Sequence, residues 1–434
     1  MIRSVRRGHS PNCSSAGSVV GVALVSLVAS AVVLNMWADR FARWAKGGPG
    51  SGKLRGADGL LHLEVEGEAA ILTLDAEDVE AAKARATPLT SPPAPAGAQS
   101  APLEVHLAVT TRCPVRCAGC YLDASPEGAE PDHAALMGAL EDLAAQGVFE
   151  VAFGGGETLL REDLFALLQR ARALGLVPNL TTSGFGLDPA KARRLAGLCG
   201  QVNVSMDGPG AVYAAVRGWD GAGLALRSIA TLREAGVRVG VNTVMSRPLL
   251  ETPGALSTLG RAIAEAGASE WQWLRFKPAG RGGAEWARLA PSPEHLDGLW
   301  PQLLALESET GLVMRMDCAL VPFVVSHAPD RGAVERLALT GCPGGSSLFA
   351  RSASGAWGPC SFAVDEQSPE NSSSWQNNAT LKTWRERAAA PPEPCGSCEW
   401  RAICRGGCRV VAGFLTGDPL AADPECPRVR GVLA

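Results

Sequence analysis

Residues 110–124 read TTRCPVRCAGCYLDA and contain Cys113, Cys117 and Cys120 in the spacing C-x3-C-x2-C. The stretch follows a mostly apolar run, VHLAV, that is typical of a buried strand. Three thiolates on one short loop can hold three irons of a [4Fe–4S] cluster and leave the fourth iron open to a substrate or cofactor, whereas electron-transfer clusters have four protein ligands. A zinc site is the alternative, but zinc favours four ligands arranged as two pairs.

A glycine-rich turn follows the next predicted strand. The sequence FEVAF at 149–153 runs directly into Gly154, Gly155, Gly156 and Glu157. Glycines behind a strand let a ligand approach the backbone closely, and the neighbouring carboxylate can receive an ammonium group. Similar turns are common in α/β domains without any ligand, so the motif by itself leaves a structural role open.

A second polar group follows a later strand. The sequence QVNVSMDG at 201–208 places Ser205 and Asp207 at a strand end, and Arg217 comes twelve residues after Ser205. A guanidinium group suits a ligand carboxylate because it offers a planar, bidentate fork. The alternative for Arg217 is an ordinary surface arginine.

The region from about 104 to 317 alternates strands with amphipathic helices. Asp132 is predicted to cap the first of these helices, and Gly175 and Gly236 are predicted to follow the ends of two later ones. The alternation predicts a parallel sheet, and six units are too few for a closed eight-unit barrel. The predicted strands are 104–109, 149–153, 177–182, 201–206, 237–244 and 270–276, and the predicted helices include 133–146, 162–174 and 222–235.

Together, the cysteine triplet, the GGGE turn one β/α unit later and the S-x-D-G strand end resemble the radical S-adenosylmethionine (SAM) enzymes. The resemblance implies an α/β fold with a partial (β/α)6 barrel. It also implies a [4Fe–4S] cluster whose open iron is chelated by SAM, which one-electron reduction cleaves to methionine and a hydrogen-abstracting 5′-deoxyadenosyl radical. The implied catalytic cluster ligands are Cys113, Cys117 and Cys120, the implied SAM contacts are Gly155, Gly156, Glu157, Ser205, Asp207 and Arg217, and Thr182, Ser183 and Asn242 are candidates by position alone.

The chain departs from that family at one position of the cysteine loop. Members usually have an aromatic residue just before the third cysteine, packed near the adenine. Here that residue is Gly119, and Tyr121 follows the cysteine instead. The contacts of the adenine near this loop are therefore left open.

Seven further cysteines near the C-terminus have regular gaps. Their pattern is C-x12-G-x4-C, then C-x2-C-x5-C-x3-C, then one final cysteine. It resembles the SPASM domain, a small cysteine-rich domain that carries auxiliary iron–sulfur clusters in one radical SAM subfamily; a zinc ribbon is the alternative. The resemblance implies one auxiliary cluster, expected to be [4Fe–4S], on Cys342, Cys360 and Cys408 and a second on Cys395, Cys398, Cys404 and Cys426.

The first implied auxiliary cluster lacks a fourth ligand in this pattern. Some relatives supply a cysteine six residues before the first one, but that position here is Arg336. Cys318 is a candidate replacement, and an open iron that binds substrate is the alternative. Cys13 and Cys199 are interpreted as bystanders.

SPASM enzymes mostly modify peptides or proteins, so the resemblance implies a maturase that abstracts hydrogen from a ribosomally made peptide and crosslinks or oxidises it. A flavodoxin- or ferredoxin-like protein would donate electrons, and the auxiliary clusters would accept an electron or bind the substrate. The alternative is haem or quinone-cofactor synthesis. Sulfatase maturation is disfavoured because Ser361 rather than Asp follows Cys360. A membrane electron relay is disfavoured because it needs no SAM pocket.

Composition limits the function classes further. The chain has 434 residues, 46% of them hydrophobic, which allows two or three domains, and its net charge of −4 gives no reason to expect nucleic-acid binding. Ten of the thirteen cysteines fall into the two patterns above. Metal binding in a reducing compartment explains them better than disulfides do, and this predicts a cytoplasmic catalytic domain.

The N-terminal hundred residues lie outside both resemblances. Residues 16–38 carry no charge or proline and are long enough to cross a bilayer as one helix. A true start at Met36 and a signal peptide are the other interpretations. Two strands within 59–74, with a turn at Glu66–Gly67, and a helix over 76–86 would form a leader-peptide-binding element or an added layer. The predicted division is 1–46 apolar segment, 47–90 β-hairpin and helix, 91–102 linker, 103–325 radical SAM core and 326–434 SPASM domain.

Overall fold

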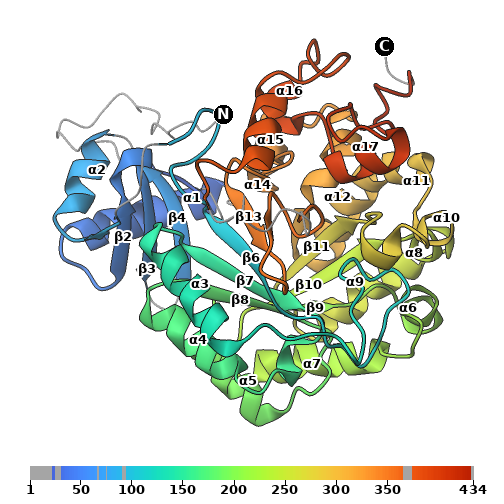
Figure 1. Ribbon diagram of the computed structural model, residues 1–434, viewed down its shortest axis with the longest axis horizontal. Helices are drawn as coiled ribbons and strands as arrows, with labels where there is room; N and C mark the ends of the chain where they lie inside the picture. Colours follow the sequence, from blue (N-terminus) through green and yellow to red (C-terminus); the bar gives the residue numbers. More distant parts are fainter. Residues whose placement is uncertain are drawn as a thin grey trace.

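The computed structural model describes residues 22–24, 31–65, 68–74, 76–89, 94–364 and 374–431. Its centre is a sheet in which seven strands lie side by side in chain order, every neighbouring pair parallel (Figure 1). Consecutive parallel strands require crossovers, which is why a helix follows nearly every strand. The strands are β6 Glu104–Thr110, β7 Glu150–Gly155, β8 Val177–Thr182, β9 Val202–Ser205, β10 Val239–Met245, β11 Glu270–Arg275 and β12 Val313–Met316.

The crossover helices cover the outside of this sheet (Figure 1). Asp132 caps the first, as predicted, by accepting hydrogen bonds from the backbone of Ala134 and Ala135. Gly175, with φ +81°, follows the end of the second, where the left-handed backbone favours glycine. The helices are α3 His133–Ala145, α4 Leu164–Ala173, α5 Pro189–Ala196, α6 Gly210–Arg217, α7 Ala222–Glu234, α8 Arg247–Glu251 and α9 Ala255–Glu265.

The six predicted strands are confirmed, each to within two residues at either end. Sequence reasoning missed β12 and two strands from the C-terminal region, β13 Leu348–Arg351 and β14 Trp357–Gly358. β13 pairs in parallel with β6, and β14 pairs antiparallel with β13. The sheet therefore ends in β12 on one side and β14 on the other, so the barrel is partial and open, as expected.

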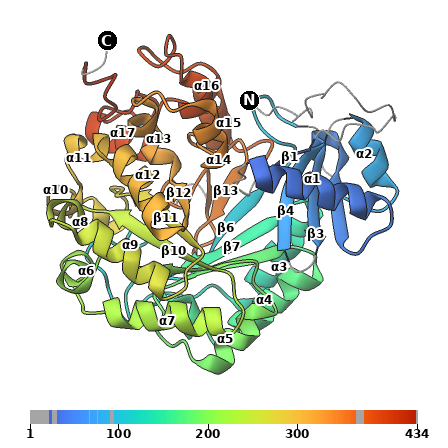
Figure 2. The ribbon, with the colours of Figure 1, turned by 180° about the vertical axis from the view of Figure 1, so that it is seen from behind.

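A smaller five-stranded sheet precedes the main one, with strand order β1-β4-β3-β2-β5. Helix α1 lies across it (Figure 2), and its Trp37, Phe41 and Trp44 are buried against the sheet with Leu61 and Leu72. The predicted strands within 59–74 and the helix after them are confirmed; residues 66–67 of the turn lie outside the described residues. The elements are β1 Val22–Leu24, α1 Ala31–Ala45, β2 Ser51–Arg55, β3 Leu60–Val65, β4 Glu68–Leu74, α2 Ala76–Lys83 and β5 Thr87–Pro88.

The prediction of one helix over 16–38 is wrong in the part that the structure describes. Val22–Leu24 is a strand paired antiparallel with β4, and α1 begins only at Ala31. Among the α1 side chains that the structure describes, Trp37, Phe41 and Trp44 cover the small sheet. Residues 16–21 and 25–30 lie outside the described residues. Within the described chain, no helix is both long enough and apolar enough to span a bilayer.

Arg55 attaches the small sheet to the amino ends of the main strands. Its buried guanidinium donates to the carbonyls of Pro102 and Gly147, which precede β6 and β7, and pairs with Asp58 at 2.7 Å. The cysteine loop follows the opposite, carboxyl end of β6. The small domain therefore lies at the far end of the sheet from that loop.

The C-terminal segments pack over the carboxyl ends of β11 and β12 (Figures 1 and 2). Arg275, the last residue of β11, pairs with Asp423 in two contacts of 2.5 and 3.2 Å and with Glu425 at 2.6 Å. The side chains of Arg275 and Asp423 are buried and that of Glu425 is mostly buried, so the attachment is largely a buried ionic one. The helices here are α10 Trp286–Leu289, α11 Pro293–Asp297, α12 Leu299–Thr310, α13 Val321–Val325, α14 Arg331–Arg336, α15 Ala379–Ala389, α16 Arg401–Cys404 and α17 Arg409–Thr416.

Candidate active site

Arg281 holds the cysteine loop in place. Its Nε and Nη2 donate to the carbonyl of Cys117 at 3.0 and 2.8 Å, Nη2 also reaches the carbonyl of Ala124 at 2.8 Å, and Nη1 pairs with Asp123 at 2.5 Å. The backbone of Arg281 donates to the carbonyl of Cys120. Sequence reasoning missed this residue, because nothing in the local sequence links it to a loop more than 150 residues earlier.

The structure explains the missing aromatic residue before the third cysteine. A Cβ at Gly119 would lie 2.8 Å from the ring of Phe276 and 2.9 Å from Leu289. Phe276, which directly follows β11, thus fills the space beside the loop. Tyr121 turns its ring toward Phe362, with 4.6 Å between ring centroids, and so faces the C-terminal region.

The glycine turn after β7 packs directly on the start of the cysteine loop. Gly155 has φ +138°, and a Cβ there would lie 2.2 Å from the carbonyl oxygen of Thr110. A Cβ at Gly156 would lie 2.1 Å from the carbonyl oxygen of Arg112. Any side chain would push the two segments apart, so these glycines are required for the close approach.

Glu157 is buried, and both oxygens of its carboxylate accept hydrogen bonds. Its carboxylate accepts hydrogen bonds from the hydroxyls of Thr182 and Ser183, both at 2.6 Å, and from the backbone N–H of Ser183 at 2.9 Å. Burial raises the pKa of this carboxyl, although these hydrogen bonds oppose the rise. The two residues suggested by position at the end of β8 are thus partners of Glu157. Its predicted contact with a SAM amino group stays a prediction.

Arg217 lies beside the loop cysteines, as its predicted role requires. Asp207 accepts from its Nε at 2.6 Å and from the backbone N–H of Val244 at 2.8 Å, and Nη1 of Arg217 lies 3.9 Å from the sulfur of Cys117. Burial lowers the pKa of the guanidinium, but the charges of Asp207 and Cys117 outweigh it, so the pKa is raised. Arg217 therefore stays charged, and the carboxylate of Asp207 fixes its orientation.

Ser205 and Asn242 are neighbours across the sheet. They occupy paired positions of β9 and β10, and both line the central cavity. The side-chain oxygen of Asn242 is buried without a hydrogen-bond partner. A buried polar atom of this kind is costly unless something binds it, so this position suits a polar ligand.

The C-terminal cysteines fall into two groups of four. Burial raises the pKa of Cys360, Cys395, Cys404 and Cys426, and the negative charge of another thiolate in the same group adds to the rise. For Cys318 the hydrogen bond to Cys342 is the largest cause of the raised pKa, and burial comes second. These effects require the sulfurs within each group to lie close together. We name them the first set and the second set. The first set is Cys318, Cys342, Cys360 and Cys408, and the second set is Cys395, Cys398, Cys404 and Cys426.

The spacing within these groups bears on the kind of metal. Among the described residues, no three His, Cys, Asp or Glu side chains are close enough together to hold one metal ion. A zinc ion would need its cysteine sulfurs about 2.3 Å from a single centre. Ligands of a multi-iron cluster bind separate irons and therefore lie farther apart. Cys199 belongs to neither group; burial raises its pKa to about 12.

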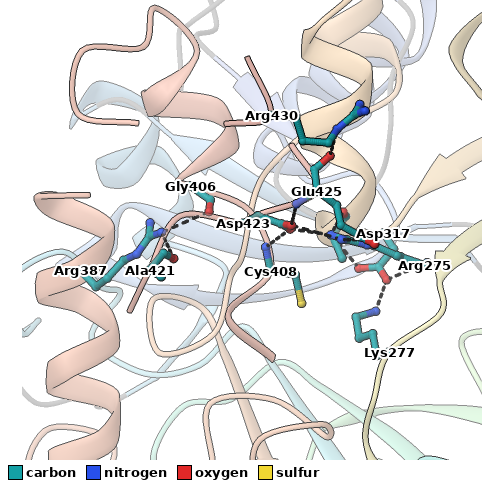
Figure 3. A network of polar contacts seen from close by, with 11 residues as sticks. Arg275, Lys277, Asp317, Arg387, Gly406, Cys408, Ala421, Asp423, Glu425 and Arg430 are labelled. Carbon is teal, nitrogen blue, oxygen red and sulfur yellow. Dashed lines mark hydrogen bonds and ion pairs between the residues drawn. The ribbon is translucent and has the colours of Figure 1, made fainter. Parts of the chain in front are cut away.

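Buried cations surround the first set. Nη1 of Arg409 lies 3.4 Å from the sulfur of Cys342. Lys277 forms an ion pair with Asp317 (Figure 3). Its Nζ also lies 4.4 Å from the ring centroid of Phe362. Asp423, which is held by Arg275, accepts a hydrogen bond from the backbone of Cys408. Sequence reasoning did not find this shell, although charged residues in LRFK at the end of a buried strand were a signal.

Arg387 supports the backbone beside the second set. Its guanidinium donates to the carbonyls of Leu420, Arg405, Gly406 and Ala421 (Figure 3). It thereby joins the segment between Cys404 and Cys408 to the segment before Cys426. A single buried side chain therefore connects two of the segments that carry these cysteines.

One cavity of about 2090 Å³ reaches both the cysteine loop and the first set. The three loop cysteines, the glycine turn, Ser205, Asp207 and Arg217 line one part of it. All four cysteines of the first set also line it, as do Lys277 and Phe362. The loop cysteines and the first set therefore open onto the same space.

Comparisons with known proteins agree with this arrangement. Residues 107–249 match the family model described as the Radical SAM superfamily. The chain is 30% identical over 352 residues to pre-heme d1 synthase of Dinoroseobacter shibae, which covers 73% of this chain and 84% of that protein. It is 30% identical over 332 residues to a PqqA peptide cyclase of Methylocella silvestris, which covers 75% of this chain and 87% of that protein.

The fold is also similar to that of a solved protein, SuiB from Streptococcus suis. Its structures bound to S-adenosylmethionine and to precursor peptide SuiA align with TM-scores of 0.59 and 0.56. Each alignment covers 75% of this chain, and 77% and 76% of SuiB, at 15% and 17% identity. At that identity the likeness is one of fold.

Proposed function

This chain belongs to the radical SAM superfamily, and from that premise we propose that it modifies a peptide or small protein by abstracting hydrogen from it. The observation that carries the proposal is the single cavity of about 2090 Å³ shared by the loop cysteines and the first set. Small-molecule pockets have volumes of roughly 300–1,000 Å³, so this space suits SAM together with a segment of chain. The PqqA peptide cyclase relative supports a peptide substrate.

Cys113, Cys117 and Cys120 would hold the [4Fe–4S] cluster that, with SAM bound, supplies the 5′-deoxyadenosyl radical. Three thiols on one loop suit such a cluster with one open iron. Arg217, aimed by Asp207, would bind the carboxylate of SAM through a charge-assisted hydrogen bond.

Other groups of the cavity would complete the SAM site. The orphaned oxygen of Asn242 and the hydroxyl of Ser205 supply polar contacts. Gly155 and Gly156 let the turn pack directly on the start of the cysteine loop, which would bring their backbone beside bound SAM. Glu157 would hold this turn against the end of β8 through Thr182 and Ser183.

We further propose that the two C-terminal sets hold auxiliary iron–sulfur clusters. The first set faces the cavity and is surrounded by cations, which suits a cluster of net negative charge. The second set is held by Arg387 farther from the loop cysteines. A flavodoxin- or ferredoxin-like protein would supply electrons, and all twelve described cysteines are free, as suits a reducing compartment.

The test is anaerobic reconstitution with iron and sulfide, followed by incubation with SAM, a reductant and short peptides encoded beside the gene. The expected product is a peptide that has lost two hydrogens, with 5′-deoxyadenosine formed alongside. The matched control is a Cys113/Cys117/Cys120→Ala variant, which should form neither. Formation of 5′-deoxyadenosine without change in any such peptide would contradict the peptide proposal.

A second candidate is oxidation of a tetrapyrrole or another cofactor precursor. The 30% identity to pre-heme d1 synthase favours it, because that relative is as similar as the peptide cyclase. The same reconstituted enzyme can be offered a porphyrin substrate. Turnover of the porphyrin and not of the peptides would favour this second function.

A further inference from the structure

We propose that Cys318 is the fourth ligand of the first set, so that this site is closed by the protein and presents no open iron to the substrate. The inference rests on the proposed function, since it requires that the first set binds an iron–sulfur cluster. Four observations carry it: the contact of Cys318 with Cys342, the rigid placement of Cys318, the surrounding charge, and the position of Arg336.

The thiol of Cys318 touches the sulfur of another member of the set. It is hydrogen-bonded to Cys342 and also to the carboxylate of Asp317. Cys318 lies just after β12, more than 20 residues before Cys342, so the sheet rather than the local sequence brings them together. The other two members, Cys360 and Cys408, line the same part of the cavity.

Cys318 is placed by the main sheet. It begins the 3-10 helix Cys318–Leu320, which Asp317 caps by accepting from the backbone of Ala319 at 3.0 Å. The backbone of Asp317 donates to the carbonyl of Trp273 in the neighbouring strand β11, and Arg275 donates its N–H to the Asp317 carboxylate. A ligand needs such fixed support, and here the buried core of the sheet provides it.

The surrounding charge suits four thiolates. A [4Fe–4S] cluster with four cysteine ligands carries net negative charge, which is costly to bury without cations. Arg409 approaches Cys342 to 3.4 Å. Lys277, whose charge also acts on Cys318 and Cys408, pairs with Asp317 (Figure 3). The negative charge of a cluster bound by Cys318 and its three partners would therefore be balanced by nearby cations.

Position 336 cannot supply the missing ligand. Arg336 is a third exposed and forms an ion pair with Glu307 of helix α12. It carries no sulfur and is engaged away from the cavity. Among the cysteines that the structure describes, Cys318 is the one left to complete the first set, since Cys199 lies three residues after helix α5 and packs against the main core.

The test uses the full chain with Cys113, Cys117 and Cys120 changed to Ala, which leaves the two C-terminal sets. After reconstitution this background should hold about eight irons, and cyanide should not change its electron paramagnetic resonance (EPR) spectrum after reduction. Adding Cys318→Ala should remove about one to four irons per chain or make the spectrum sensitive to cyanide. Cys199→Ala is the matched control and should do neither.

Two results would overturn the proposal. One is a background whose spectrum already responds to cyanide, because that requires an open iron with Cys318 intact. The other is a Cys318→Ala variant with unchanged iron content and spectrum. The first result needs no Cys318 variant, so it decides the matter even if that variant fails to fold. A background that binds no iron at all would instead contradict the proposed auxiliary clusters, and not the choice of ligand within them.

Discussion

The carboxylate of Asp207 orients the guanidinium of Arg217 toward the cysteine loop. Asp207 lies 2.6 Å from Nε of Arg217, and Nη1 of the same side chain lies 3.9 Å from the sulfur of Cys117. The two residues come from the end of β9 and from the last turn of α6. Because Asp207 is itself held by the backbone of Val244, the direction of Arg217 is set by the sheet.

Asp207→Asn should therefore weaken SAM binding. The change keeps the shape and the contact with Val244 but removes the charge that orients Arg217. Hydrogen bonds to charged groups contribute about 1.5–3 kcal/mol, so the Kd for SAM should rise roughly tenfold or more. Equilibrium binding to the reconstituted enzyme measures this. Arg331→Ala, which breaks an exposed ion pair with Glu335, is the control; an equal effect there would refute the role of Asp207.

Arg281→Lys should loosen the cysteine loop. A lysine cannot reproduce the fork that donates twice to the carbonyl of Cys117 and also reaches Ala124. The variant is expected to lose iron from the loop site faster in air than the parent protein does. Iron release is followed with a chelator in chains that lack the C-terminal cysteines of the second set. Arg288→Lys, at a more exposed position nearby, should leave the rate unchanged.

Lys277→Met should destabilise the protein. It leaves the carboxylate of Asp317 buried without its cation, a change that costs about 3–5 kcal/mol. The double variant Lys277→Met/Asp317→Asn should recover at least half of that loss, because the uncompensated charge is gone. Urea denaturation measures both. The exposed Lys382→Met is expected to change stability by less than about 0.5 kcal/mol; no recovery in the double variant would argue against the charge explanation.

Glu150 should make stability depend on pH. Burial, with the charge of Glu104 adding to it, raises the pKa of its carboxyl to about 7. The pKa of a glutamate in an unfolded chain is about 4.3. The folded state therefore binds this proton more tightly, and the contribution of Glu150 to stability falls as pH rises through 7. The melting temperature of Glu150→Gln should rise relative to the parent between pH 5.5 and 8, by roughly 3 °C. A difference that stays constant over this range would contradict the assignment.

The sequence predicted the main sheet because its strands are buried and appear as apolar runs followed by glycine or polar turns. The short strands β12 and β13 escaped because four residues carry too little pattern, and only their pairing partners make them strands. The apolar run at 16–38 was misinterpreted because hydrophobicity alone does not distinguish one membrane-spanning helix from a strand followed by the start of a helix. Val22–Leu24 within this run is a strand of the small sheet, and Trp37 near its end belongs to helix α1, which packs on that sheet.

The cysteines of the site could be predicted from spacing, but the residues that support them could not. Lys277 and Asp317 lie 40 residues apart, and Phe276 fills the space beside Gly119 from the segment that follows β11. Such partners are brought together by the order of strands in the sheet. Glu157 illustrates the same limit: its motif predicted a ligand contact, and the structure shows three strong hydrogen bonds to the end of the next strand.

The most direct test of the account is the cleavage of SAM by the reconstituted chain. Iron content and 5′-deoxyadenosine are measured anaerobically after addition of SAM and dithionite. The account predicts about twelve irons per chain and 5′-deoxyadenosine that disappears in the Cys113/Cys117/Cys120→Ala variant. One or two zinc ions with no cleavage of SAM would contradict it and leave a metal-stabilised protein without this chemistry.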